Sequence, residues 1–336
     1  MAHLKVLFIT NWYPSREQPT KAVWVREHAR AVRIYDDVRV LHCPGADPGL
    51  KTVWMAEQKT DEELQNGIPL YRVWYRPYRI PAAPYFAYAW SIIRAFRQIV
   101  KNGFRPDIIH VHIYDAAAPA IFIGAINRIP VVVSEHFSSF PRRLLRRADI
   151  FKAWVAFRWA DRVLPVSHAL QKAIERYGIN ACFQVVPNVA DTALFYPRPE
   201  PTKAGDPKRL LFVGQFAAVR GISYLLRALA RLRGKRDDWR LDLVGDGEAR
   251  SEHEQLSADL KLCDKVAFHG LKTKREVAEY MRRADLFVLP SLCETFSAPA
   301  AEALASGTPV LSTRCGGPEE FVTQEEIGRA SCRERV

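Results

Sequence analysis

Short apolar runs alternate with segments of helical period along the first half of the chain. Apolar runs at residues 5–10, 38–41, 107–112, 131–134, 163–166 and 184–186 predict buried strands, and helices are expected at 23–32, 119–127 and 168–177. This alternation predicts an α/β fold with a doubly wound parallel sheet. Ligands bind outside the carboxyl ends of such strands. Four polar residues follow strands directly, so we expect them to line one crevice: Asn11, His112, His136 and Ser167.

The second half repeats the pattern. Strands are expected at 209–214, 241–247, 266–270, 286–289 and 309–312, with helices from Ile222 and over 275–283. A further helix has Ser297 as its expected N-cap and Gly307 as its stop. Residues 197–208 are rich in proline and charge, which is typical of a linker. The sequence therefore predicts an N-terminal domain (1–192), a linker (193–208) and a second domain (209–325), with substrates between the domains.

The segment 290–322 combines a strand, a loop and a helix with two carboxylates spaced eight residues apart. Glu294 lies in the loop and Glu302 lies inside the helix. A helix start presents free N–H groups and suits a pyrophosphate, while a carboxylate one turn later can bind a ribose diol. On spacing alone, the favoured interpretation is that Glu294 is a surface loop residue and Glu302 a solvated helix residue, because lone Glu pairs are common.

The wider segment carries a more specific pattern. Phe296, Glu-Ala-Leu-Ala from Glu302, Gly-Thr-Pro-Val from Gly307 and Gly-Gly-x-x-Glu from Gly316 together resemble the E-x7-E signature of retaining glycosyltransferases of family 4, which have the GT-B fold. The resemblance implies two Rossmann-like domains facing a cleft, with the second incomplete. It also implies that Glu302 binds the donor ribose, that Glu294 contacts the donor sugar, and that amides near Phe296 and Ser297 hold phosphate.

Other segments carry the same resemblance. In the family, the turn after Gly214 has an Arg and a Lys that clamp pyrophosphate; here the positions hold Gln215 and Arg220, followed by Gly221. Arg220 can still pair with phosphate in a bidentate manner. His136 resembles the family histidine that reaches the donor sugar. The opening loop after Asn11, in which Ala22 stands where glycine is usual, is similar to loops that approach the acceptor, so Asn11 and His112 are placed on the acceptor side.

The resemblance further implies a mechanism and its substrates. A nucleotide diphosphate sugar is the expected donor, a polysaccharide or lipid-linked glycan the expected acceptor, and a hexose the expected group transferred with retention of configuration. We expect no metal, because the chain has no D-x-D motif. A metal site made by His110, His112 and His136 remains a minor alternative, since residues two apart on a strand share a face.

The chain is basic, with 49 Lys and Arg against 37 Asp and Glu and a net charge of +12. Basic residues and aromatics interleave in 71–101 and 142–158. These segments are either surfaces for anionic lipid or helices whose aromatics face the core and whose arginines are solvated. Six scattered cysteines without C-x-x-C, and no apolar run near the ~18 residues that span a bilayer, predict a cytoplasmic protein, with peripheral contact at the inner membrane face left open.

The last residues depart from the family pattern. Residues 326–336 have no apolar periodicity and resemble a translated sequencing adapter, so we expect a non-native tail on a chain truncated at its C-terminus. Two other functions remain as alternatives: a GT-B sugar-nucleotide epimerase, which needs no acceptor, and a basic nucleic-acid-binding protein. The second is disfavoured because no nucleic-acid-binding motif is present.

Overall fold

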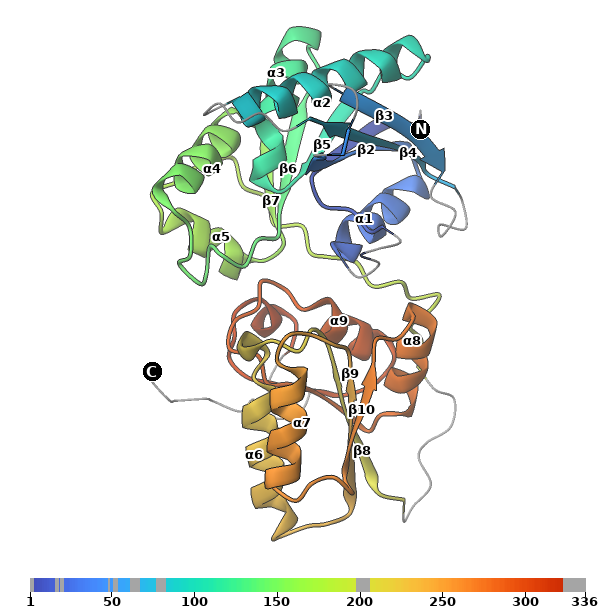
Figure 1. The fold of residues 1–336 in the computed structure, drawn as a ribbon, viewed down its shortest axis with the longest axis vertical. Coiled ribbons are helices and arrows are strands. Elements are labelled where there is room, and N and C mark those ends of the chain that lie inside the picture. The colour runs from blue at the N-terminus through green and yellow to red at the C-terminus, as the bar shows by residue number, and fades with distance from the viewer. Residues whose placement is uncertain are drawn as a thin grey trace. The chain divides into compact units, whose positions relative to one another are not determined.

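The computed structural model describes residues 3–15, 18, 21–47, 49–50, 54–60, 67–76, 83–197 and 206–322. These residues form two compact units, and the boundary between them along the chain falls between Val189 and Ala190. Each unit contains one sheet with helices on both faces, and each is described by itself (Figure 1). The predicted tail 326–336 and half of the predicted linker, residues 198–205, lie outside the described residues.

Unit 1 contains a seven-stranded sheet in the order β3-β4-β2-β1-β5-β6-β7. Its strands are β1 (Lys5–Thr10), β2 (Asp37–Ala46), β3 (Trp54–Thr60), β4 (Pro69–Tyr75), β5 (Ile108–His112), β6 (Val131–Glu135) and β7 (Arg162–Pro165). Every described pairing is parallel except β3 with β4, which is antiparallel. The predicted doubly wound parallel sheet is therefore confirmed, with an antiparallel edge strand that the apolar pattern did not indicate.

The helices of unit 1 cover the sheet on both faces. They are α1 (Val23–Arg33), α2 (Ala83–Lys101), α3 (Ala117–Asn127), α4 (Arg147–Trp159) and α5 (His168–Glu175), with the 3-10 turn η1 (Tyr114–Ala116) after β5. Right-handed crossovers put α1 on one face and α2, α3 and α4 on the other. Helix α3 packs against both α2 and α4 (Figure 1). On the face of the sheet that α1 covers, the core is formed by alternate residues of β1 and β2, including Val6, Phe8, Val38 and Val40.

Unit 2 contains a five-stranded parallel sheet in the order β10-β9-β8-β11-β12. The strands are β8 (Lys208–Val213), β9 (Trp239–Val244), β10 (Val266–Gly270), β11 (Leu286–Leu289) and β12 (Val310–Ser312). The helices are α6 (Ile222–Arg233), α7 (Arg250–Asp259), α8 (Lys274–Arg283) and α9 (Ala298–Ala305), with 3-10 turns η2 (Ala218–Arg220) and η3 (Gly317–Glu320).

Alternate strand residues of unit 2 enter two separate cores. Leu211 and Phe287 pack into the core beside Ala278 of α8 and Ala300 of α9, whereas Phe212 packs with α6. Both faces of the central strands are thus apolar, as expected for a buried parallel sheet.

Two expectations about local structure were wrong. The predicted strand at 184–186 is not a strand; the chain there makes a single bridge, between Val163 and Phe183. Ser297 occupies the N-cap position of α9, but its backbone is left-handed (φ 70°) and its hydroxyl accepts no capping bond. The left-handed backbone points the side chain away from the helix amides that a capping serine normally binds.

Candidate functional site

Two turns at the carboxyl edge of the second sheet meet around Gly221. Gly221 follows η2 with φ of 68°, and a Cβ there would lie 2.0 Å from the Pro290 carbonyl oxygen. The amide of Leu292 donates to the Val219 carbonyl oxygen at 2.9 Å. Only glycine fits so close an approach, so this residue joins the turn after β8 to the loop after β11.

Arg220 and Glu294 form an ion pair across these two turns. The Ser291 hydroxyl donates to the same Glu294 carboxylate oxygen at 2.8 Å. Glu294 is buried while about a third of the Arg220 side chain is exposed. The structure therefore brings together two of the predicted donor-site residues, and each is the other's counter-ion.

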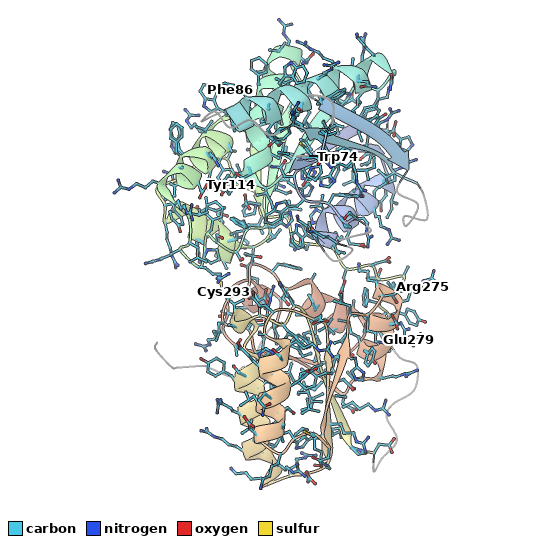
Figure 2. The ribbon with its side chains drawn as sticks, viewed as in Figure 1. Trp74, Phe86, Tyr114, Arg275, Glu279 and Cys293 are labelled. Carbon is cyan, nitrogen blue, oxygen red and sulfur yellow. The ribbon has the colours of Figure 1, made fainter. Side chains whose placement is uncertain are left out.

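Glu294 is fixed by its backbone as well as by its side chain. Its amide donates to the Cys315 carbonyl oxygen at 2.8 Å, and its carbonyl accepts from the Gly317 amide at 3.0 Å. A Cβ on Gly317 would lie 2.1 Å from the Thr295 carbonyl oxygen. The Gly-Gly turn therefore holds the Glu294 loop in place, with Cys293 at its start (Figure 2).

The start of α9 has an unusual polar group. The Ser297 hydroxyl is buried and has no hydrogen-bond partner in the described part of the chain. Phe296 packs beside it on Phe321, with ring centroids 5.0 Å apart. A buried hydroxyl without a partner costs free energy, so this position is suited to receive a polar ligand atom.

Glu302 is buried on α9 and lies beside Lys274, with Oε1 3.5 Å from Nζ. Lys274 begins α8 and also lies over the Phe195 ring at 5.6 Å. Sequence reasoning missed Lys274. Its signal was weak, because a lysine among Lys272, Thr273 and Arg275 is ordinary on a helix start.

In unit 1 the predicted residues at the strand ends include a stack of histidines. His112 Nδ1 lies 3.1 Å from His136 Nε2, and the His110 and His112 rings stack at 4.5 Å. His28 of α1 meets the His112 and His136 rings edge-on and bonds Asn188. Burial lowers the pKa of all four histidines, so they are neutral at pH 7. His112 is fully buried, so any role it has is exerted through His136.

Glu135 positions His136 and was not singled out by the sequence. Its buried carboxylate accepts from the amides of His136 and Phe137 at 2.8 Å and from the amide of Tyr114, which follows β5, at 3.1 Å (Figure 2). Burial raises the pKa of Glu135 to about 7 despite these three bonds. An acidic residue that ends an apolar strand directly before a histidine was the available signal.

A cavity of about 330 Å³ lies in unit 1 at the ends of β1, β2 and β4. Asn11 lines it, and its Oδ1 accepts from the Tyr88 hydroxyl at 2.6 Å. Asp115 and Lys152 also line it, and their charged atoms lie 3.8 Å apart. The remaining lining residues are Trp12, Lys21, Cys43, Pro44, Gly45, Tyr75 and Tyr85. Within the described ranges, no three or more His, Cys, Asp or Glu side chains group to hold a metal ion.

Comparison with known families accounts for both units. The model for Glycosyltransferase Family 4 matches residues 22–194, and that for Glycosyl transferases group 1 matches residues 197–331. The chain belongs to glycosyltransferase family 4. The E-x7-E resemblance is thereby confirmed, and the family assignment favours a transferase over an epimerase.

Individual relatives and solved structures agree with this family. A Mycobacterium tuberculosis glycogen synthase is 27% identical over 91% of this chain and 76% of its own. A Bacillus subtilis glycosyltransferase assigned to teichuronic acid biosynthesis is 29% identical over 94% of this chain and 82% of its own. Anabaena HepE in complex with UDP and glucose aligns with a TM-score of 0.71 at 22% identity, over 96% of this chain and 83% of its own. A sucrose-phosphate synthase from Thermosynechococcus elongatus aligns with the same TM-score at 19% identity, over 97% and 85%. The fold is GT-B, as predicted.

Proposed function

We propose that this glycosyltransferase moves a hexose from a nucleotide diphosphate sugar to a glycan or lipid-linked acceptor with retention of configuration. The observation that carries the proposal is the Arg220–Glu294 pair in the same β11–α9 segment as the Ser297 hydroxyl, which has no hydrogen-bond partner among the described residues. A guanidinium, a free hydroxyl and the first amides of α9 form a set of donors that suits a diphosphate.

Each donor-side residue then has a role. Arg220, with Gly221 keeping its turn close to the Pro290 loop, neutralises the diphosphate. Gly214, whose amide donates to the Val244 carbonyl oxygen, begins the same turn and belongs to the donor-binding set. The Phe296 and Ser297 segment supplies amides, and Glu302 binds the ribose diol. Glu294 of unit 2 and His136 of unit 1 orient the sugar, while Glu135 and His112 position His136.

The transfer step balances without a further reagent. The bond between the anomeric carbon and the diphosphate oxygen breaks, and its electron pair stays on that oxygen, where Arg220 stabilises the charge. The acceptor hydroxyl oxygen bonds the same face of the anomeric carbon and gives its proton to the departing phosphate oxygen. Neutral His136 can accept or donate a hydrogen bond to the sugar without adding charge.

The acceptor belongs, in this proposal, in the cavity beside Asn11. Tyrosine hydroxyls, an amide and a carboxylate set among aromatic walls suit a sugar ring, which has polar edges and apolar faces. Two lysines there favour an acceptor that carries negative charge. We further propose that the enzyme works in the cytoplasm, at the inner face of the membrane, on a cell-envelope polysaccharide; the teichuronic acid relative supports this assignment. No helix in the described ranges has the length and apolarity to cross a bilayer.

Thermal shift with a panel of nucleotide diphosphate sugars tests the donor site. One sugar nucleotide should raise the melting temperature, and Glu302→Ala should abolish the shift. Proton NMR of the product then reads its anomeric configuration. An inverted product would refute retention, and turnover of the sugar nucleotide to an epimer without acceptor would replace transfer by epimerisation.

A further inference from the structure

Nine large apolar side chains are exposed on the helical layer formed by α2, α3 and α4. Their exposed fractions run from 44% to 69%. They are Tyr85, Phe86 and Trp90 of α2, Phe122 and Ile126 of α3, Leu144 in the turn before α4, and Phe151, Trp154 and Trp159 of α4. We name this set, with the basic residues below, the α2–α4 face. So many exposed apolar groups on one layer mark an interaction surface.

The same layer carries most of the net charge of the chain. Residues 83–101, 117–128 and 141–159 contain ten basic residues and one acidic residue, Asp149, for a net charge of +9, against +12 for the whole chain. All ten basic residues are exposed. They are Arg94, Arg97, Lys101, Arg128, Arg142, Arg143, Arg146, Arg147, Lys152 and Arg158. Only Lys152 is close to carboxylates, at 3.8 Å from Asp115 and 3.5 Å from Asp149, among the ion pairs described for this layer.

Aromatic and basic groups are interleaved on a continuous surface. Helix α3 packs between α2 and α4, so the three helices form one layer (Figure 1). The Arg94 guanidinium lies 5.0 Å from the Trp90 ring, and the Phe151 and Trp154 rings stack at 6.2 Å. Figure 2 labels Phe86 near the start of α2, at the margin of unit 1.

We propose that the α2–α4 face docks unit 1 onto an anionic membrane surface. Exposed Trp and Tyr suit the headgroup region, Phe, Leu and Ile suit the acyl boundary, and the arginines suit anionic headgroups. Nucleic acid shares the charge preference but has no use for exposed Phe86, Phe122 and Ile126, so lipid is the occupant that uses the whole face.

The face is continuous with the proposed acceptor cavity. Tyr85 and Lys152 belong to the face and also line that cavity. Docking through this face therefore places the mouth of the cavity at the headgroup level, where a lipid-linked acceptor presents its polar head. This part of the inference rests on the proposed function, whereas the docking does not.

Co-sedimentation with vesicles tests the docking. The full chain should bind vesicles of phosphatidylglycerol and phosphatidylcholine, should bind pure phosphatidylcholine vesicles far less, and should dissociate as salt is raised. Arg146→Gln combined with Arg147→Gln should weaken binding on the order of tenfold. Phe86→Ser combined with Phe151→Ser should weaken it by a similar factor and make the remaining binding more salt-sensitive.

Matched variants on unit 2 provide the control. Arg231→Gln combined with Lys235→Gln removes two exposed charges from the region of α6, and Tyr224→Ser removes the exposed aromatic residue of that helix. These should bind vesicles as the parent does, and all variants should keep the thermal shift with the donor sugar nucleotide. Three outcomes would each overturn the proposal. The first is an equal loss of vesicle binding in the α2–α4 face variants and in the unit 2 controls. The others are binding to neutral vesicles as strong as to anionic ones, and binding to single-stranded RNA in place of vesicles. A lost donor shift with vesicle binding retained would count against the proposed function alone.

Discussion

At the scale of single residues, the charge of the arginine in the proposed donor site is neutralised by a carboxylate of the same unit. Arg220 and Glu294 pair with each other, and Ser291 adds a hydrogen bond to the carboxylate. If Arg220 binds the diphosphate as proposed, the diphosphate must displace Glu294, which then becomes free to meet sugar hydroxyls. Binding of the diphosphate would then replace the Glu294 carboxylate by a phosphate as the ion-pair partner of Arg220.

Glu294→Gln should raise the affinity for a free nucleoside diphosphate and lower the rate of sugar transfer. The neutral amide no longer competes for Arg220, so the anion gains on the order of tenfold in affinity, about 1.4 kcal/mol. Titration calorimetry with UDP and with other nucleoside diphosphates measures the gain. Glu279→Gln, which alters an exposed pair with Arg283, is the matched control and should change nothing. Weaker nucleotide binding by Glu294→Gln would contradict the exchange.

The buried histidines should make the fold sensitive to acid. Burial lowers the pKa of His42 and of His110 to about 3, whereas in the unfolded chain each has its ordinary value near 6.5. Below pH 6.5 the unfolded state takes up protons that the folded state does not. The free energy of unfolding is therefore highest above pH 6.5 and falls between pH 6.5 and 3, by roughly 1.4 kcal/mol per pH unit for each histidine.

Urea unfolding across that pH window measures this slope. His110→Gln keeps a side chain able to bond the Ser134 hydroxyl, 2.8 Å from His110 Nε2, and should reduce the slope by about 1.4 kcal/mol per pH unit. Identical slopes for His110→Gln and the parent would contradict a neutral, buried His110.

At the scale of elements, the close approach of the turn after β8 to the loop after β11 fixes the positions of the residues in the proposed donor site. Gly221→Ala should destabilise unit 2 by roughly 2–4 kcal/mol, because the added Cβ meets the Pro290 carbonyl and the backbone is left-handed. Chemical denaturation measures the loss. Gly234→Ala, at the end of α6 where a Cβ meets nothing closer than 3.8 Å, should be neutral or slightly stabilising. Equal effects at both glycines would show that the Gly221 contact is unimportant.

The sequence predicted elements well where burial alone decides them. Strands such as β11 and helices such as α6 follow directly from apolar period. The β3–β4 hairpin and α7 were not foreseen. β4 begins at Pro69 and runs into the segment 71–101, which the sequence analysis interpreted as an aromatic and basic cluster. Helix α7 has only two buried residues, His253 and Ser257, so it has no clear apolar stripe.

The donor-binding roles of the site residues stay predictions, and the contacts that these residues make were not predicted. The motif located Arg220, Glu294 and Glu302, yet their partners Ser291 and Lys274 depend on how turns from distant strands meet. The Ser297 error has the same origin, because a serine before a helix predicts a cap only if its backbone is extended. Tertiary packing of the β11–α9 loop sets that backbone instead.

At the scale of the whole molecule, the two units have separate cores, and the residues that we propose to bind the donor lie in unit 2, apart from His136. Saturating sugar nucleotide should therefore stabilise unit 2 in particular, by about 2.7 kcal/mol at 100 times the dissociation constant. Differential scanning calorimetry, with hydrogen exchange to locate the protection, measures this. Glu302→Ala provides the control that loses the effect. Protection confined to unit 1 would contradict a donor site in unit 2.

The Arg220–Glu294 pair also bears on the end of each catalytic cycle. A spent nucleoside diphosphate is more highly charged than the sugar nucleotide, and an isolated guanidinium would retain it. Here the Glu294 carboxylate, which is held by the Ser291 hydroxyl and by backbone hydrogen bonds, can pair with Arg220 again once the sugar has left. In the proposed donor site, this internal competition would speed the release of the nucleoside diphosphate and limit product inhibition.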